Sequence, residues 1–340
     1  MQCAEEDDNS PESQQIIEMI RDTHQTQNLT SIVYRIVQND EVLAAGGIGE
    51  SMIGSDVSAT QNMFFRTGNV AYEMLGALVL LLVESGSITL EDTIDMYLDS
   101  EKLQLPNADS VTLEMLVRST SGYPDYVDEQ IFLDMITQNP FRSFEWTELV
   151  EIAFENGEPW CAPGTCFKYS HTNFILLGKA LEVATGETLQ QLLETRIIEP
   201  LGLAETATQL TPLVPSPVLH TYSAERSLAT DSAMKLLDES TYWNPTWHSY
   251  PGGVVTSNVC DLIGYAKGLG SGVLFEDPNS YQIFLNNSTL PPPANCERCV
   301  DFAERNGYYG MGFAGSNSWI AATPIFGGAG QLVGYLPVAT

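Results

Sequence analysis

Residues 64–98 read FFRTGNVAYEMLGALVLLLVESGSITLEDTIDMYL, and this stretch decides the fold. Asn69 is a favourable N-terminal cap for a helix, and Gly86 is a favourable C-terminal cap. The acidic residues of the next segment predict a second helix over residues 89–98. Between the two caps, apolar residues recur at spacings of three and four, which predicts a buried helix with a core face of Val70, Met74, Ala77, Leu78, Leu81 and Leu82.

The segments before this helix predict a hairpin and a shorter helix. Residues 31–38 (SIVYRIVQ) and 41–49 (EVLAAGGIG) are rich in strand-forming residues, and the turn dipeptide Asn39-Asp40 separates them. Residues 14–25 predict a short amphipathic helix ahead of the hairpin.

The rest of the chain predicts helices in the middle and strands at the end. Residues 276–306 have a loop-like composition, and glycine-rich strand patterns follow from Tyr308. Helical patterns occupy residues 144–156, 173–186, 188–198 and 261–269.

Strands at both ends of the chain suggest one antiparallel sheet with a helical lobe inserted at about residues 88–250. The fold class is therefore predicted to be α+β. We expect a disordered acidic tail at residues 1–13 and a single two-lobe domain over residues 14–340. A functional site is expected where the lobes meet.

The charge of the chain excludes two classes of partner. Fourteen Lys and Arg residues against 44 Asp and Glu residues give a net charge of −30. Such a surface repels nucleic acid and anionic membranes. The sequence also contains no apolar run of the length that a transmembrane helix needs, so no transmembrane span is predicted.

The cysteines predict two short disulfide loops. Cys161 and Cys166 bracket a turn, which suits a bridge between them. Cys296 and Cys299 lie in a proline-rich connection, where a second disulfide, a redox pair or half of a zinc site are the alternatives. No second ligand pair lies nearby, so structural disulfides are favoured, and with them an exported protein. No metal ion and no cofactor are predicted.

Several blocks of the chain, in order, resemble the β-lactamase-related serine hydrolases, the group of class C β-lactamases, D-alanyl-D-alanine carboxypeptidases and related esterases. That resemblance implies a β-lactamase/transpeptidase-like fold. It also implies further strands and a C-terminal helix beyond the last block, which we expect to be missing. The resembling blocks are FRTG (65–68), LVRSTSGYPDY (116–126), PGTCFKYSHTNFILLG (163–178), EPLGL (199–203), GGVVTS (252–257), YGMGF (309–313) and GGAGQLVGY (327–335).

The resemblance also implies a mechanism, which this chain does not match. In the family, a serine at the helix start attacks a carbonyl after a lysine three residues later activates it. Here the serine position holds Asn69, which cannot form the acyl ester, and the lysine position holds Tyr72, which is neutral near pH 7. Among the main catalytic positions only Tyr169 keeps its family identity. Three other positions are substituted. The asparagine of the family's second motif, in the block at 163–178, is His171, and the His or Lys of its third motif, in the block at 327–335, is Gly328. The histidine of the family's HTSG sequence, in the block at 116–126, is Ser119.

Each of these residues has a functional and a structural interpretation. Asn69 either contacts a ligand or caps the helix, and the cap is favoured. Tyr72 and Tyr169 form either a hydroxyl pair in a cleft or ordinary packing between the lobes. His171 is either a base or a structural histidine, and the structural role is favoured. The Ser-Ala-Met-Lys at 232–235 lacks the surrounding pattern and is interpreted as coincidence.

Three functions follow, in order of preference. The first is a catalytically inactive member of the family that binds a small molecule or peptide in the old cleft. The second is an active hydrolase in which Tyr169 or Tyr72 attacks and His171 acts as base. The third is a structural or assembly protein, and the oligomeric state is left open. The predicted ligand-binding residues are Asn69, Tyr72, Ser119, Tyr169, His171 and Gly330.

Overall fold

The computed structural model describes residues 10–155, 157–224, 226, 237–248, 250, 253–286, 289–294, 296, 299–302, 304, 306–316, 318–323, 325, 326 and 328–336. Most of the predicted acidic tail and the Ser-Ala-Met-Lys at 232–235 lie outside these residues.

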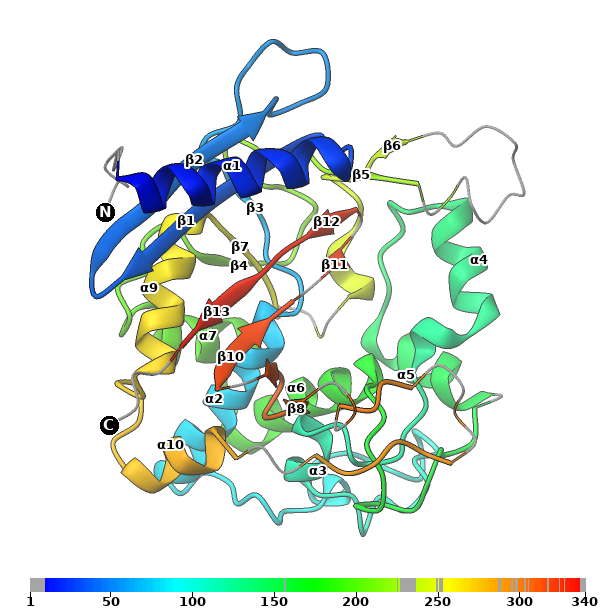
Figure 1. Ribbon diagram of the computed structural model, residues 1–340. Helices are drawn as coiled ribbons and strands as arrows, with labels where there is room; N and C mark the ends of the chain where they lie inside the picture. Colours follow the sequence, from blue (N-terminus) through cyan, green and yellow to red (C-terminus); the bar gives the residue numbers. More distant parts are fainter. Residues whose placement is uncertain are drawn as a thin grey trace.

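The N-terminal part is a helix lying on a hairpin. Helix α1 (Pro11–Thr26) begins earlier than predicted, because Pro11 suits the first turn and the Ser10 hydroxyl accepts a hydrogen bond from the third residue after it. Strands β1 (Ser31–Gln38) and β2 (Glu41–Gly49) form the predicted hairpin with the predicted bounds. Its turn residues have φ values of +50° and +69°, as a tight hairpin turn of this type requires. Figure 1 shows α1 across the hairpin at one end of the molecule.

The α+β fold is confirmed, with antiparallel strands at both ends of the chain. Among the described residues, hydrogen bonds place the two ends in separate sheets rather than in one. The hairpin stands alone, and the C-terminal sheet has the order β13-β10-β9-β8. Helix α9 (Val259–Gly270) contacts both β1 and β13. The C-terminal sheet comprises β8 (Gly307–Tyr309), β9 (Ala314–Ser316), β10 (Trp319–Ala322) and β13 (Val333–Tyr335).

Three smaller sheets bring distant segments together. β7 (Val254–Ser257) lies between β3 (Phe65–Arg66) and β4 (Ala207–Gln209), and so anchors the turn that leads into the long helix. The remaining pairs are β5 (Tyr222–Ser223) with β6 (Asp238–Glu239) and β11 (Ile325–Phe326) with β12 (Ala329–Gly330).

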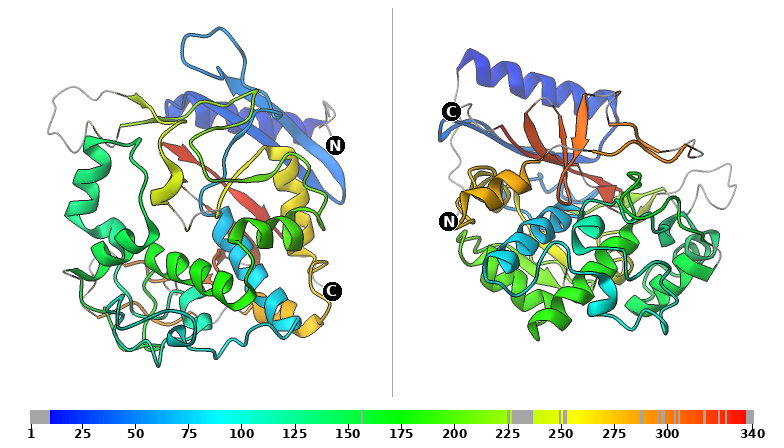
Figure 2. Two further views of the ribbon diagram at one scale, coloured as in Figure 1. Left: turned by 180° about the vertical axis from the view of Figure 1, so that it is seen from behind. Right: turned by 90° about the horizontal axis from the view of Figure 1, so that it is seen from below.

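The long helix α2 (Val70–Glu84) has its predicted bounds and forms the centre of the helical part. Of its predicted core-face residues, all are buried except Leu81, which is half-buried, and Gly86 takes the left-handed conformation that ends the helix. Figure 2 shows the other helices of this part on the side of the molecule away from the hairpin. They are α3 (Leu113–Val117), α4 (Gln130–Gln138), α5 (Trp146–Glu155), α6 (His171–Thr185), α7 (Leu189–Leu193) with a π turn at Glu194–Ile198, and α10 (Pro278–Phe284).

Two secondary-structure predictions are wrong. Residues 89–98 form only a 3₁₀ turn at Ile94–Met96. The N–H of Ile94 donates to the carbonyl of Val111, and the carbonyl of Leu90 accepts from the N–H of Glu114, whereas an α-helix would pair residues 94 and 90 with each other. The loop predicted at residues 276–306 contains α10, which begins with an Asp277 cap.

Both predicted disulfides are confirmed, between Cys161 and Cys166 and between Cys296 and Cys299. Within the described parts of the chain, no helix combines the length and the apolar character needed to cross a membrane. The division into lobes at residues 88 and 250 remains a prediction.

Candidate functional site

Asn69 lies in the turn between β3 and α2, at the position of the family's serine. Its side-chain Nδ2 donates a hydrogen bond to the Tyr169 hydroxyl at 2.8 Å. The predicted cap is wrong, because the side chain accepts no hydrogen bond from the helix N-terminus. The Oδ1 atom is buried and has no hydrogen-bond partner among the described residues. The amide is therefore directed at the one retained catalytic position instead of at its own helix.

Tyr72, at the position of the family's lysine, is completely buried and packed between two rings. Its ring lies parallel to that of Phe174, with 3.9 Å between centroids, and stacks on that of His248 at 5.7 Å. Its hydroxyl donates to the backbone carbonyl of His248 at 2.5 Å. The packing interpretation of Tyr72 therefore matches its surroundings.

Tyr169 holds its proton firmly. Burial raises the pKa of its phenol well above the ordinary value, and the nearby phenols of Tyr72 and Tyr309 act in the same direction. A phenol in this state is a weak nucleophile near neutral pH, and its oxygen already accepts the hydrogen bond from Asn69.

His171, the first residue of α6, forms a pair that the sequence did not predict. Its Nδ1 donates to the buried carboxylate of Asp125 at 2.9 Å. Burial opposes the charge on Asp125, but the electrostatic interaction with His171 and the hydrogen bonds from His171 and the Val127 N–H outweigh it and lower the pKa of Asp125. An ionised Asp125 orients the imidazole, as the acid does in a base–orienter pair.

His248 also belongs to the site, although no sequence pattern predicted it. It follows η4 (Pro245–Trp247) in a segment that carries no motif spacing. Its ring centroid lies 5.8 Å from that of His171. Burial, and then electrostatic interactions with His171 and Arg66, place the pKa of His248 well below the ordinary value, so the ring is neutral near pH 7.

Gly328, at the His or Lys position of the third motif, contacts the main chain of β5. Its φ is +90°, and a Cβ placed there would lie 1.8 Å from the carbonyl oxygen of Tyr222. A side chain fits here only if β5 moves. Gly328 and Gly330 are both exposed, but a Cβ on Gly330 would meet nothing within 4 Å.

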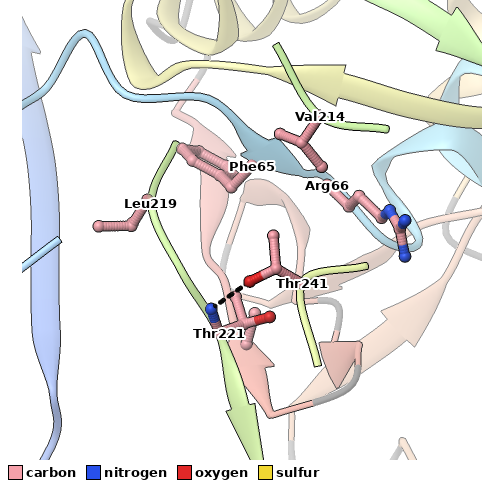
Figure 3. Close-up of a pocket in the computed structure, with 7 residues that line it drawn as sticks. Phe65, Arg66, Val214, Leu219, Thr221 and Thr241 are labelled. Carbon is pink, nitrogen blue, oxygen red and sulfur yellow. Dashed lines mark hydrogen bonds between the residues drawn. The ribbon is translucent and has the colours of Figure 1, made fainter. Parts of the chain in front are cut away.

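The space beside the third motif is almost filled. A cavity of about 10 Å³ borders Ala329, which is at the lower limit for one water molecule. Figure 3 shows Phe65, Thr221 and Thr241 closing it, with the Thr221 N–H donating to the Thr241 hydroxyl at 2.8 Å. Arg66 also lines it, and burial lowers the pKa of its guanidinium to about 10.

Ser119, at the position of the HTSG histidine, is completely buried with a φ of +53°. Its carbonyl accepts a hydrogen bond from the N–H of Lys168 at 3.0 Å, which braces the strand-like segment leading to Tyr169. Ser119 thus helps to position the segment that carries Tyr169.

The structure brings together Asn69, Tyr72, Tyr169 and His171, as the motif positions require. The groups gathered there are an amide, two phenols, an imidazole held by a carboxylate and a neutral imidazole. This set donates and accepts hydrogen bonds, but it lacks the hydroxyl–amine pair of the family's acyl-transfer chemistry.

A larger groove opens on the flank of this site. Its volume is about 690 Å³, and Asp125, which holds His171, forms part of its wall. Three segments line the groove, within residues 124–129, 157–166 and 292–294. Its volume falls within the range of ligand-binding pockets.

Comparisons with known proteins agree with this architecture. The chain is 28% identical over 156 residues to Penicillin-binding protein 4 of Amycolatopsis lactamdurans, covering 46% of this chain and 39% of that protein. It is 24% identical over 194 residues to Protein flp of Staphylococcus aureus (strain MW2), covering 57% of this chain and 38% of that protein. The matches thus span about two fifths of the length of these curated relatives.

A solved structure extends the likeness to nearly the whole chain. A D-stereospecific amidohydrolase from a Streptomyces species superposes with a TM-score of 0.74 at 20% identity, covering 96% of this chain and 94% of the other. At this identity the likeness concerns the fold. The model of the Beta-lactamase family matches residues 16–338, and the chain therefore belongs to that family.

Proposed function

We propose that this protein is a catalytically inactive member of the Beta-lactamase family that binds a small molecule or peptide beside the former active site. The observation that carries the proposal is the hydrogen bond from the Asn69 amide to the Tyr169 hydroxyl. In the resembling enzymes this place belongs to a serine that attacks the substrate. An amide nitrogen shares its lone pair with the carbonyl and does not attack.

The neighbouring positions support the same proposal. Tyr72 supplies no amine to accept a proton, and its hydroxyl is directed at a backbone carbonyl. Gly328 supplies neither a donor nor a cation, and the main chain of Tyr222 occupies the adjacent space. Restoring one residue alone would leave the other functions missing.

Covalent labelling tests the inactive state. The protein is incubated with a fluorescent penicillin and, separately, with a fluorophosphonate probe, and its intact mass is measured. We expect no mass increase beyond that of a heat-denatured sample, whereas an acylating enzyme labelled in parallel gains the probe mass. An adduct on the folded protein that maps to residues of the site would overturn the proposal.

The pair of Asp125 and His171 favours a second candidate, a hydrolase that uses His171 as base. In this version His171 activates the Tyr169 hydroxyl or a water molecule. Hydrolysis of p-nitrophenyl esters and D-amino-acid amides is measured for the protein and for Tyr169→Phe and His171→Ala. Activity that is equal in all three proteins rules this version out.

We also propose that the protein is exported. The two disulfides support this location, because such bonds persist in oxidising compartments. Fractionation of the source cells, with free-thiol labelling of each fraction, tests the location.

A further inference from the structure

The groove on the flank of the site combines negative charge with an aromatic and proline-rich surface. Its carboxylates are Asp125, Asp128, Glu129 and Glu158, and Asp125 is already paired with His171. Each of its three segments contributes proline, and Trp160 adds a ring that remains 39% exposed. An exposed indole on the wall of a groove offers a face for a ligand.

Two residues that line the groove already contact an ammonium group of the protein itself. Lys168 Nζ lies 3.0 Å from the Asp128 carboxylate and 5.5 Å from the centre of the Trp160 ring. An ammonium between a carboxylate and an indole face is the geometry by which proteins recognise organic cations. Lys168 neutralises only one carboxylate, so Glu129 and Glu158 keep the groove negative.

The environment of the groove raises the pKa of Glu129. Burial raises its pKa, and the neighbouring charge of Asp128 raises it further. A cation bound between these groups relieves the repulsion, so charge complementarity favours a positively charged ligand.

The walls of the groove are held in place by covalent bonds. The disulfide of Cys161 and Cys166 closes one wall, and the disulfide of Cys296 and Cys299 follows directly after another. The N–H of Phe167 donates to the carbonyl of Pro291 at 2.9 Å and ties these two walls together. A groove fixed in this way loses little conformational entropy when a ligand binds.

We propose that this groove binds an extended peptide through a lysine or arginine side chain, with the cationic head at Glu129 and Glu158 and the aliphatic stem against Trp160 and the prolines. The proline-lined walls suit a stem with methylene groups, and the carboxylates at the rim suit its charged end. This inference names the ligand class for the binding role in the proposed function and rests on that role.

Calorimetric titration tests the proposal. The probes are a blocked pentapeptide with alternating arginine and lysine, the same peptide with glutamine at those positions, and free spermidine. We expect the basic peptide to bind with a Kd below about 1 mM, and tighter than spermidine, while the glutamine peptide shows no heat. No binding of the basic peptide, or tighter binding of spermidine, would overturn the assignment to a peptide.

Matched variants separate the groove from the general negative charge of the protein. Glu129→Gln with Glu158→Gln is expected to weaken peptide binding by about fivefold or more. Glu91→Gln with Glu101→Gln makes the same change in charge at two exposed residues outside the groove lining, and is expected to leave the Kd within about twofold. An equal loss in both double variants would mean that the peptide responds only to net charge, and would refute the groove.

Trp160→Ala and Trp160→Phe test the aromatic wall in the same assay. The alanine variant is expected to weaken binding by about threefold or more, and the phenylalanine variant by less. Equal affinity of the alanine variant and the unchanged protein contradicts the proposed stem contact. Labelling by the penicillin probe is independent of these titrations, so the inactive state and the groove can fail separately.

Discussion

The Asn69 side chain donates a hydrogen bond to the Tyr169 hydroxyl across 2.8 Å and so joins the start of α2 to the segment before α6. The same contact leaves the Asn69 Oδ1 buried without a partner in the described part of the chain. The position that a nucleophile holds in the resembling enzymes has thus become a structural link between two elements.

The first prediction concerns a serine at this position. We expect Asn69→Ser to remain unlabelled by penicillin, because Tyr72 still lacks an amine and Gly328 still lacks a donor. Intact-mass measurement after incubation checks this outcome. The control is Asn69→Ala, which has no hydroxyl, and a serine adduct that is absent from this control would show that the other positions are dispensable.

Tyr72 should matter for stability. Tyr72→Phe keeps the stack on Phe174 and loses the hydrogen bond to the His248 carbonyl, so the free energy of unfolding should fall by about 1–2 kcal/mol. Tyr72→Lys also loses the stack and places an amine in the core, so it should lose about 3 kcal/mol or more. Urea unfolding of both variants gives the comparison. If the lysine variant were the more stable, the site would retain a place for the family's amine.

Position 328 has a matched control two residues away. Gly328→Ala should lower the free energy of unfolding by about 2 kcal/mol or more, because the new Cβ meets the Tyr222 carbonyl and φ is left-handed. Gly330→Ala should change it by less than about 1 kcal/mol, because nothing lies within 4 Å. Thermal and urea unfolding measure both, and similar losses would contradict the contact between Gly328 and β5.

The free energy of unfolding should fall as the pH rises, because a buried acid in α2 loses its proton. Glu73 is 3% exposed, and burial raises its pKa to about 8, although a hydrogen bond from the Tyr265 hydroxyl opposes the rise. Between the pKa of the unfolded chain, near 4.5, and about 8, the native state binds more protons than the unfolded state. The free energy of unfolding therefore falls over this window, by a few kcal/mol at most, and levels off above it.

Glu73→Gln tests this prediction because it keeps the shape and removes the titration. Urea unfolding at intervals from pH 5 to pH 9 should show a smaller decline for the variant than for the unchanged protein. Parallel curves for the two proteins would show that another group causes the decline.

At low pH, the pair of Asp125 and His171 should make the free energy of unfolding fall as the pH decreases. The lowered pKa of Asp125 means that its contribution to stability is complete above the unfolded pKa, near 3.8, and is lost as pH falls through the native pKa. Asp125→Asn should cost about 3 kcal/mol at pH 7, because it removes the carboxylate from a buried pair. Acid unfolding of both proteins checks this, and an unchanged acid limb in the variant would contradict the assignment.

The sequence predicted the elements whose determinants are local. The hairpin at residues 31–49 and the helix at 70–84 have the predicted bounds, because a turn dipeptide, an apolar period and a glycine stop are each sufficient within a few residues. The prediction at 89–98 failed because the backbone groups of Leu90 and Ile94 form hydrogen bonds with the distant segment 111–114 instead of with each other, which no local pattern encodes. Helix α10 did carry a signal, the Asp277-Pro278 start, which the proline-rich surroundings obscured.

The site residues that occupy motif positions were predicted from the sequence. Contacts that only the tertiary fold creates were missed. Asn69, Tyr72, Tyr169 and His171 meet as expected. Asp125 lies within the block at residues 116–126, but its pairing with His171 was not predicted, and His248 reaches the site from a segment without motif spacing. The cap predicted for Asn69 is not formed, and its side chain instead donates to the hydroxyl of Tyr169, which is distant in the sequence.

The contact of Gly328 with Tyr222 sets a limit on redesign. A protein engineer can replace a side chain, but the obstacle here is a peptide carbonyl, which every amino acid carries. Rebuilding a hydrolase on this scaffold would require a different path for residues 222–223, by loop grafting or deletion. The path of the main chain thus prevents a side chain at the third-motif position, and a point mutation does not restore it.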